Sequence, residues 1–118
     1  MGRLRIAIET RDLDTFGALL ADDVRWGDDT HPRRCRSRAD VVATMARGLG
    51  QGGAAQLVEL TAGADGVLCG LDVQWPDQAG RPSARRLYHA YIVRGGLIGE
   101  IRPFDHRNAA AEAVGVPA

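Results

Sequence analysis

The spacing of apolar residues changes once along the chain, from a helical period to a period of two. Apolar side chains recur at helical spacing over residues 3–10 and again over 16–20, where an acidic run closes the second segment. Apolar and polar residues then alternate over 24–26. This pattern predicts two short helices followed by a short strand.

Capping signals mark where two of the helices begin. Asp12 or Asp14 is available as the N-cap of the second helix. Ser37 followed by Asp40 resembles a capping box and predicts a third helix that continues to the glycines near residue 50.

Alternation with a period of two begins at Gln56 and runs through four segments that are bounded by turn residues. In the first segment, Val58 and Leu60 are expected on the same apolar face. The four expected strands are 56–61, 67–75, 85–93 and 97–106. An alanine-rich run then predicts a terminal helix that ends before Gly115.

Helices followed by consecutive strands are typical of α+β domains, in which an antiparallel sheet packs helices on one face. A chain of 118 residues is long enough for one hydrophobic core. We therefore expect a single domain over residues 1–118, with a curled, mostly antiparallel sheet around the N-terminal helices. A curled sheet that helices close off encloses a pocket.

This element order, together with FGALLADDVRWGDD (residues 16–29) and GEIRPFDHR (residues 99–107), resembles the SnoaL-like proteins of the nuclear transport factor two-like superfamily. The resemblance covers nearly the whole chain. It implies a cone-shaped α+β barrel, a small-molecule pocket without a cofactor, and a homodimer formed through the outer sheet face. Tyr88 and Ile92 are expected on that outer face. The superfamily contains enzymes, binding modules and scaffolds, so the fold alone does not define the function.

Asp28 is the first candidate catalytic residue. It matches the general base of ketosteroid isomerase-like members of the superfamily, which lies on the first strand. It also shares strand parity with Trp26, and a carboxylate against an indole in an apolar pocket has its pKa raised toward neutrality. The alternative is a solvated strand end. Those enzymes also use a tyrosine on the first helix to donate a hydrogen bond to the oxyanion. The matching position here is Leu4, which has no such donor and argues against a steroid isomerase.

His89 is the second candidate, because it shares a strand face with Leu87 and Tyr91. A histidine among apolar residues is either a satisfied interior side chain or one half of a proton-transfer pair with Asp28. Arg102, the third candidate, shares a face with Glu100. It is interpreted either as an anion stabiliser or as half of an Arg–Glu pair on the outer sheet face. The expected pocket walls are Trp26, Trp75, Tyr91 and Phe104.

Composition and charge argue against several classes of binding partner and site. The 15 basic and 15 acidic residues give zero net charge, which removes the usual electrostatic reason to bind nucleic acid or acidic membranes. No apolar run approaches the ~18 residues of a membrane span, and the N-terminus lacks a signal-peptide core, so we expect a cytoplasmic protein. Neither Cys35 nor Cys69 lies in a CxxC pair, and we expect two free thiols and no metal site.

Two functions remain open at the level of sequence. One is a SnoaL-like enzyme of the isomerase, cyclase or dehydratase type, which transfers a proton on an apolar, carbonyl-bearing substrate without a cofactor. The other is a non-catalytic protein of the same fold that binds a small apolar ligand or acts as a dimeric scaffold.

Overall fold

The computed structural model describes residues 2–27, 36–50, 52–76 and 82–117, with the backbone alone at 75, 76, 82 and 83. The predicted order of elements is confirmed. Its first half contains α1 (Gly2–Thr10), α2 (Leu13–Ala18), β1 (Leu20–Trp26) and α3 (Arg38–Gly50). Its second half contains β2 (Ala54–Ala62), β3 (Gly66–Pro76), β4 (Pro82–Arg94), β5 (Leu97–Phe104) and α4 (Arg107–Val114).

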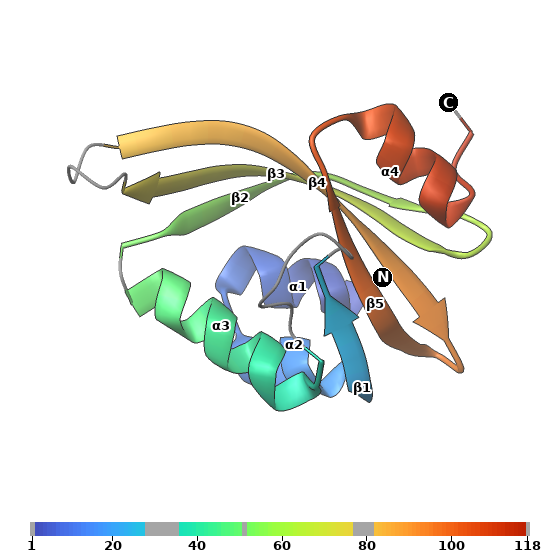
Figure 1. The fold of residues 1–118 in the computed structure, drawn as a ribbon, viewed down its shortest axis with the longest axis horizontal. Coiled ribbons are helices and arrows are strands. Elements are labelled where there is room, and N and C mark those ends of the chain that lie inside the picture. The colour runs from blue at the N-terminus through green and yellow to red at the C-terminus, as the bar shows by residue number, and fades with distance from the viewer. Residues whose placement is uncertain (1, 28–35, 51, 77–81, 118) are drawn as a thin grey trace.

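The five strands form one sheet in the order β1-β5-β4-β3-β2. β1 runs parallel to β5, and the other neighbouring pairs are antiparallel. The sheet curls over α1, α2 and α3, while α4 lies against the opposite face (Figure 1). The predicted curled, mostly antiparallel sheet around the N-terminal helices is thus confirmed, and it stays open between its edge strands β1 and β2.

The predicted capping residues are confirmed at two helix starts. Asp12 caps α2, where its carboxylate accepts hydrogen bonds from the Thr15 backbone N–H at 3.1 Å and from the Thr15 hydroxyl at 2.6 Å. At α3, the backbone N–H of Asp40 donates to the Ser37 hydroxyl at 3.1 Å. Each cap satisfies a backbone donor that the first helical turn leaves unpaired.

The second helix ends earlier than the helical spacing predicts, at Ala18. Leu20 already belongs to β1, where it lies opposite Ile98 of β5, and the Ile98 N–H donates to the Leu19 carbonyl at 2.9 Å. Pairing with β5 therefore ends the helix before Leu20, because it outweighs the local preference of this segment for helix. As a result, the acidic run that was expected to close the helix lies inside β1.

The expected faces of β2 are wrong at two neighbouring residues, Leu57 and Val58. The pairing register with β3 shifts between Leu57 and Glu59, so that Val58 is the extra residue of a β-bulge. Val58 is consequently 44% exposed, whereas Leu57 packs on the same core as the buried Leu60. Strict alternation predicts the reverse, because it assumes no extra residue in the strand.

The sheet has an apolar cluster on each face. The inner cluster fills the space between the sheet and α1, α2 and α3, and it includes Phe16, Val24 and Val41. The outer cluster lies beneath α4 and contains Leu68, Ala90, Ala110, Ala111, Val114 and Val116, with Tyr88, Ile92, Phe104 and Ala113 packed against it. Tyr88 and Ile92, which the sequence analysis expected on the outer sheet face, lie on that face and pack against the cluster under α4.

An ion pair fixes α4 to the sheet. Arg107, at the start of α4, donates from Nε and from one terminal nitrogen to the two carboxylate oxygens of Glu59, each at 2.8 Å. This fork is the strong, geometrically specific form of the Arg–carboxylate contact, and it holds the pKa of Glu59 below its ordinary value. The outer face of the sheet is therefore covered by the chain itself around β3, β4 and β5.

Candidate functional site

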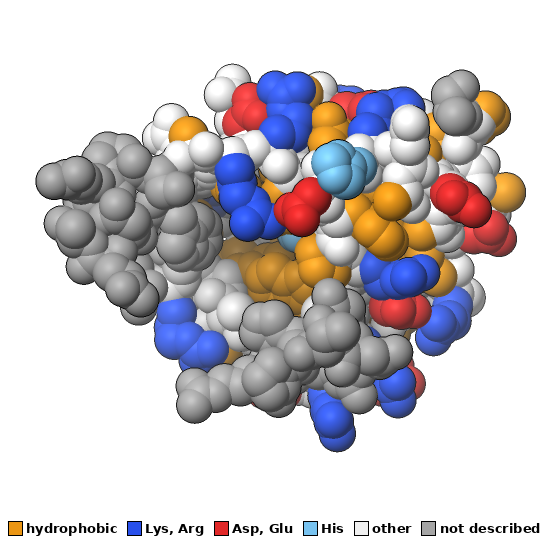
Figure 2. Space-filling model, turned by 45° about the horizontal axis from the view of Figure 1, so that its top comes forward, with side chains coloured by type: hydrophobic (Ala, Val, Ile, Leu, Met, Phe, Trp, Pro, Cys, Tyr) orange, Lys and Arg blue, Asp and Glu red, His pale blue; other side chains and the backbone are white. Residues whose placement is uncertain are grey.

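A pocket of about 390 Å³ lies between the inner face of the sheet and helices α1, α2 and α3. Its described lining consists of Ala7, Ile8, Arg11, Leu13, Phe16, Trp26, Thr44, Met45, Leu49, Ala55, Leu71, Val73, Arg85, Leu87, His89 and Tyr91. Most of these side chains are apolar, and no carboxylate is among them. Figure 2 shows the hollow with a hydrophobic floor and charged side chains at its edge. Such a pocket suits an apolar molecule with few polar groups.

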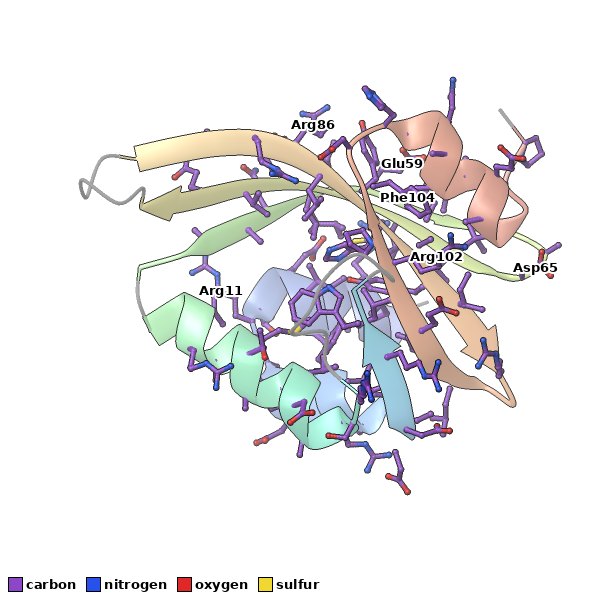
Figure 3. All side chains as sticks on the ribbon, viewed as in Figure 1. Arg11, Glu59, Asp65, Arg86, Arg102 and Phe104 are labelled. Carbon is purple, nitrogen blue, oxygen red and sulfur yellow. The ribbon has the colours of Figure 1, made fainter. Side chains whose placement is uncertain are left out.

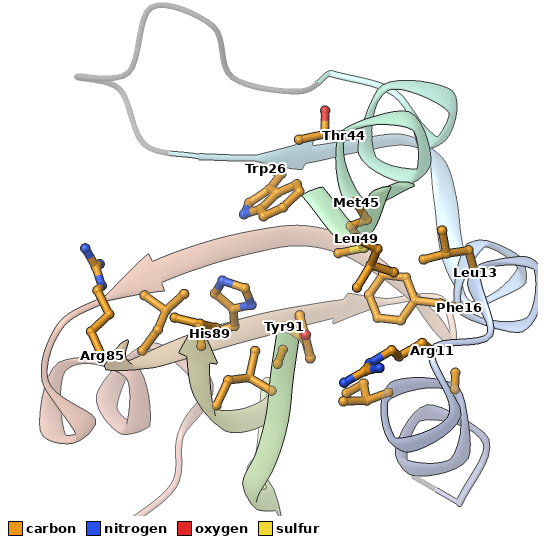
Figure 4. A pocket seen from close by; sticks show the side chains of 16 residues that line it. Arg11, Leu13, Phe16, Trp26, Thr44, Met45, Leu49, Arg85, His89 and Tyr91 are labelled. Carbon is orange, nitrogen blue, oxygen red and sulfur yellow. The ribbon is translucent and has the colours of Figure 1, made fainter. Parts of the chain in front are cut away.

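His89 is a buried polar group among the described lining residues of the pocket (Figure 4). It projects from β4, its side chain lies beside the rings of Trp26 and Tyr91 at centroid distances of 6.0 and 5.8 Å, and the residue is only 4% exposed. Neither of its ring nitrogens has a hydrogen-bond partner within the described part of the chain. Burial lowers the pKa of His89 to about 4, so the ring is neutral at physiological pH.

A neutral imidazole offers one N–H donor and one nitrogen acceptor. Both are unused by the described residues, and an unsatisfied buried polar group costs about 1–3 kcal/mol. A ligand oxygen that reaches either nitrogen would recover that energy. The arrangement is therefore suited to hold a carbonyl, enolate or hydroxyl oxygen against the ring.

Tyr91 is a wall of the pocket rather than a second polar group. Its ring packs edge-on against Phe16 at 6.2 Å, and burial raises the pKa of its hydroxyl, so the hydroxyl stays protonated. Burial raises the pKa of Cys69 to about 12, so this free thiol stays protonated and is no nucleophile.

Two arginines supply the charge in the described lining, Arg11 and Arg85. Arg85 is in an ion pair with Asp105 at 3.0 Å, which neutralises its charge locally. Arg11 follows directly after α1, and its side chain extends toward the pocket near Phe16 (Figure 4). The sequence analysis singled out neither residue, because an isolated arginine beside a helix end or in a strand has the pattern of a surface residue.

The structure brings together three of the residues that the sequence predicted for the pocket. Trp26, His89 and Tyr91 all line it, from β1 and β4. Strand parity found His89 and Tyr91, and it could have found Leu87 as well. The lining from α1, α2 and α3 has no comparable signal, since apolar helix residues have the same pattern whether they fill a core or border a cavity.

Arg102 and Phe104 do not line the pocket, which corrects the expectation that Phe104 is one of its walls. Both lie on the α4 side of the sheet (Figure 3), where Phe104 packs against the outer cluster. The Arg102 guanidinium stacks over the Phe104 ring at 5.3 Å and is 3.8 Å from Glu100. Side chains alternate along β5, so both point to the face opposite to that of Ile101, and Ile101 is buried in the inner cluster. The outer-face Arg–Glu pair is thus the interpretation that the geometry favours.

The side chains of the two remaining candidates are not among the described ones. Asp28 falls in the range 28–35, and of Trp75 only the backbone is described, opposite Ser83 in the β3–β4 ladder. The described residues contain no group of three or more histidine, cysteine or acidic side chains that could hold a metal ion. Nor do they include a helix with the length and apolarity that a membrane span requires.

Comparison with known proteins agrees with this architecture. A family model described as a SnoaL-like domain matches residues 3–101. No curated protein matches the sequence. Among solved structures, an NTF2-like protein of unknown function from Burkholderia pseudomallei superposes with a TM-score of 0.70 at 17% identity, covering 97% of this chain and 95% of the other.

Two further structures are similar to this chain and carry functional descriptions of their own. A putative polyketide cyclase from Sinorhizobium meliloti matches with a TM-score of 0.65 at 18% identity, over 86% of this chain and 90% of that one. A Mycobacterium tuberculosis protein in complex with estradiol-17beta-hemisuccinate matches with a TM-score of 0.66 at 20% identity, over 90% and 89%. At these identities the likeness is one of fold.

Proposed function

The chain belongs to the SnoaL-like domain family, and from its pocket we propose that it is an enzyme that transfers a proton on an apolar, carbonyl-bearing small molecule. One observation carries the proposal. His89 is a neutral, buried ring in an apolar pocket, and neither of its nitrogens has a partner among the described residues. The match to the SnoaL-like family model and the estradiol-17beta-hemisuccinate complex of a protein with a similar fold support a small-molecule ligand.

The chemistry that this pocket favours is removal of a proton from the carbon next to the carbonyl. A base takes the proton, the C–H electrons form a carbon–carbon double bond, and the carbonyl electrons move onto the oxygen. The His89 N–H then donates a hydrogen bond to the oxygen, where negative charge develops in a site with little water to compete. The neutral ring has one N–H, and it keeps that proton when it donates the hydrogen bond.

The base in this proposal is Asp28, on the strength of its match to the base of ketosteroid isomerase-like relatives. Asp28 lies outside the described residues, so its role rests on the sequence. Trp26, two residues before it, is on the pocket wall. The step moves one proton between the carbon and the carboxylate and needs no cofactor.

One observation favours the second candidate function, which is binding without turnover. Leu4, at the position that matches the oxyanion tyrosine of ketosteroid isomerases, is 5% exposed and belongs to the inner hydrophobic cluster. A leucine there donates no hydrogen bond, so His89 would act on the oxygen without that second donor. A protein that only holds an apolar ligand needs no such donor.

Deuterium exchange distinguishes the two functions. In D₂O, the methyl protons of 2-acetylnaphthalene exchange when a base removes them, and NMR follows the loss of their signal. We expect the wild-type protein to accelerate this exchange, and Asp28→Asn to lower the acceleration about 100-fold, the usual contribution of a positioned base. His89→Phe should lower it as well, because the enolate oxygen loses its donor.

His106→Gln is the matched control. His106 is an exposed histidine before α4 that makes no side-chain cap hydrogen bond, so its loss should leave the exchange rate unchanged. If the ketone binds and perturbs the His89 ring resonances without any exchange, the protein is a binding protein. If the ketone does not bind at all, the pocket is not a site for apolar carbonyl compounds and both functions fail for this ligand class.

A further inference from the structure

We propose that the natural ligand of the pocket carries an anionic group, such as a carboxylate, at one end of its apolar body, and that Arg11 binds this group. The proposal rests on the proposed function only in taking the pocket as a small-molecule site. It adds the class of ligand: an amphipathic organic acid, with its anion beside Arg11 and its apolar body along the sheet.

Arg11 occupies a backbone position that glycine normally fills. The Asp12 N–H donates to the Ala7 carbonyl at 3.0 Å and the Arg11 N–H to the Ile8 carbonyl at 3.3 Å, which together form a Schellman motif at the end of α1. Arg11 therefore has φ of 56°, and it is the one non-glycine residue with positive φ in the described ranges. A side chain in this conformation is strained relative to glycine.

No contact of the Arg11 side chain within the described fold offsets the free-energy cost of that strain. It has no ion pair or side-chain hydrogen bond among the described residues. The two acidic residues nearest to it in the sequence are engaged elsewhere: Asp12 caps α2, and Glu9 pairs with Arg5 at 3.4 Å. A strained residue without an internal partner is a candidate for binding something external.

The position of Arg11 fits an anion at the mouth of the pocket. Its side chain lies on the inner side of the sheet (Figure 3) and extends toward the cavity beside Phe16 (Figure 4). The residue is also exposed, so the guanidinium keeps its solvation in the empty pocket. The planar guanidinium has two parallel N–H donors that match the two oxygens of a carboxylate.

The charge balance of the pocket points the same way. The described lining contains two arginines and no carboxylate, and one of the arginines is already neutralised by Asp105. The unpaired positive charge of Arg11 therefore favours an anionic ligand over a neutral one of the same shape. A cationic ligand would meet repulsion at this end and find no described carboxylate in the pocket.

Two probes that differ by one carboxylate test this inference: 6-acetyl-2-naphthoate and 2-acetylnaphthalene. We expect calorimetry to show that the wild-type protein binds the carboxylate about tenfold more tightly, a typical effect of one charge-assisted, partly solvated contact. The preference should shrink as NaCl is raised, because exposed charges are screened. Arg11→Gly should abolish this preference, because it weakens binding of the carboxylate more than binding of the neutral ketone.

Arg11→Gly also separates the binding role from a structural one. Glycine suits the left-handed position, so the variant should unfold at the same urea concentration as the wild type or at a higher one. Arg3→Gln removes an exposed arginine of α1 that does not line the pocket, and it should keep the tenfold preference.

Equal binding of the two probes to the wild-type protein would overturn the anion inference and leave the proposed function standing. So would a preference that survives in Arg11→Gly. A variant that loses stability would show that Arg11 has a structural role, which contradicts the strain argument. Failure of both probes to bind would count against the pocket itself, and hence against the proposed function as well.

Discussion

Replacing Gly66 with alanine is expected to destabilise the fold by about 3 kcal/mol or more, near the top of the range for overpacked positions. Gly66 begins β3, directly after the turn that joins it to β2, and it lies opposite Ile92 of β4. A Cβ atom at Gly66 would overlap the backbone carbonyl of Tyr91. A backbone group cannot rotate away as a side chain can, so the β3–β4 ladder would have to separate.

The damage should reach the pocket, because Tyr91 is one of its walls and the next lining residue along β4 is His89. Urea unfolding would measure the loss, and binding of 2-acetylnaphthalene would report on the pocket. Gly50→Ala is the matched control: Gly50 is the last residue of α3, and its Cβ would have no neighbour within 4 Å. That variant should be as stable as the wild type or slightly more so, since alanine favours helix. A Gly66→Ala protein of wild-type stability would contradict the close packing of β3 on β4.

The order of elements could be predicted because each element carries its own local signal. Asp12 and Ser37 cap helices, and Gly95 and Gly96, both with positive φ, form the turn that the RGG sequence indicates. These signals act within a few residues. They do not depend on what the segment later packs against.

The errors occurred where a distant part of the chain decides the local structure. Leu20 left the helical pattern because β5 pairs with it, and the bulge at Val58 reversed the expected faces within β2. Phe104 follows a strand pattern that does not reveal which face holds the pocket, and α4 covers its face. Pairing partners and bulges are properties of the assembled sheet, which one sequence does not display.

The candidate site was predictable to a similar degree. Parity along β4 placed His89 and Tyr91 together, because side chains two apart on a strand share a face. Arg11 was missed, since its importance depends on a backbone angle and on the absence of a partner among the described residues. Both are features of the folded molecule.

Substituting His89 by phenylalanine is expected to make the fold more stable, and increasingly so as the pH falls. The folded pKa of His89 is about 4, against 6.5 for an ordinary histidine, because the buried ring resists protonation. The unfolded chain therefore binds more protons than the native state between pH 6.5 and 4. The free energy of unfolding is therefore unaffected by protonation of His89 above pH 6.5. It falls by roughly 3 kcal/mol in all as the pH is lowered from 6.5 toward 4.

His89→Phe removes both this loss and the cost of the unsatisfied ring nitrogens. At pH 7 the variant should be more stable than the wild type by about 1 kcal/mol or more, and the gap should widen by roughly 3 kcal/mol at pH 4. Urea unfolding at several pH values would measure both effects. The lowered pKa values of Asp12, Glu59 and Asp72 also make stability fall in acid, but at lower pH and equally in both proteins, so they cancel in the difference.

His106→Gln, which replaces an exposed histidine, should keep the pH dependence of the wild type. If the stabilities of wild type and His89→Phe instead stay parallel between pH 7 and 4, the folded pKa of His89 is close to its ordinary value. A nearby carboxylate would have that effect, because it favours the charged ring. The same measurement would then be repeated with Asp28→Asn introduced into both the wild type and His89→Phe. If the difference in stability between these two proteins becomes larger in acid, Asp28 is that carboxylate, and the two residues are the interacting pair that the sequence suggested.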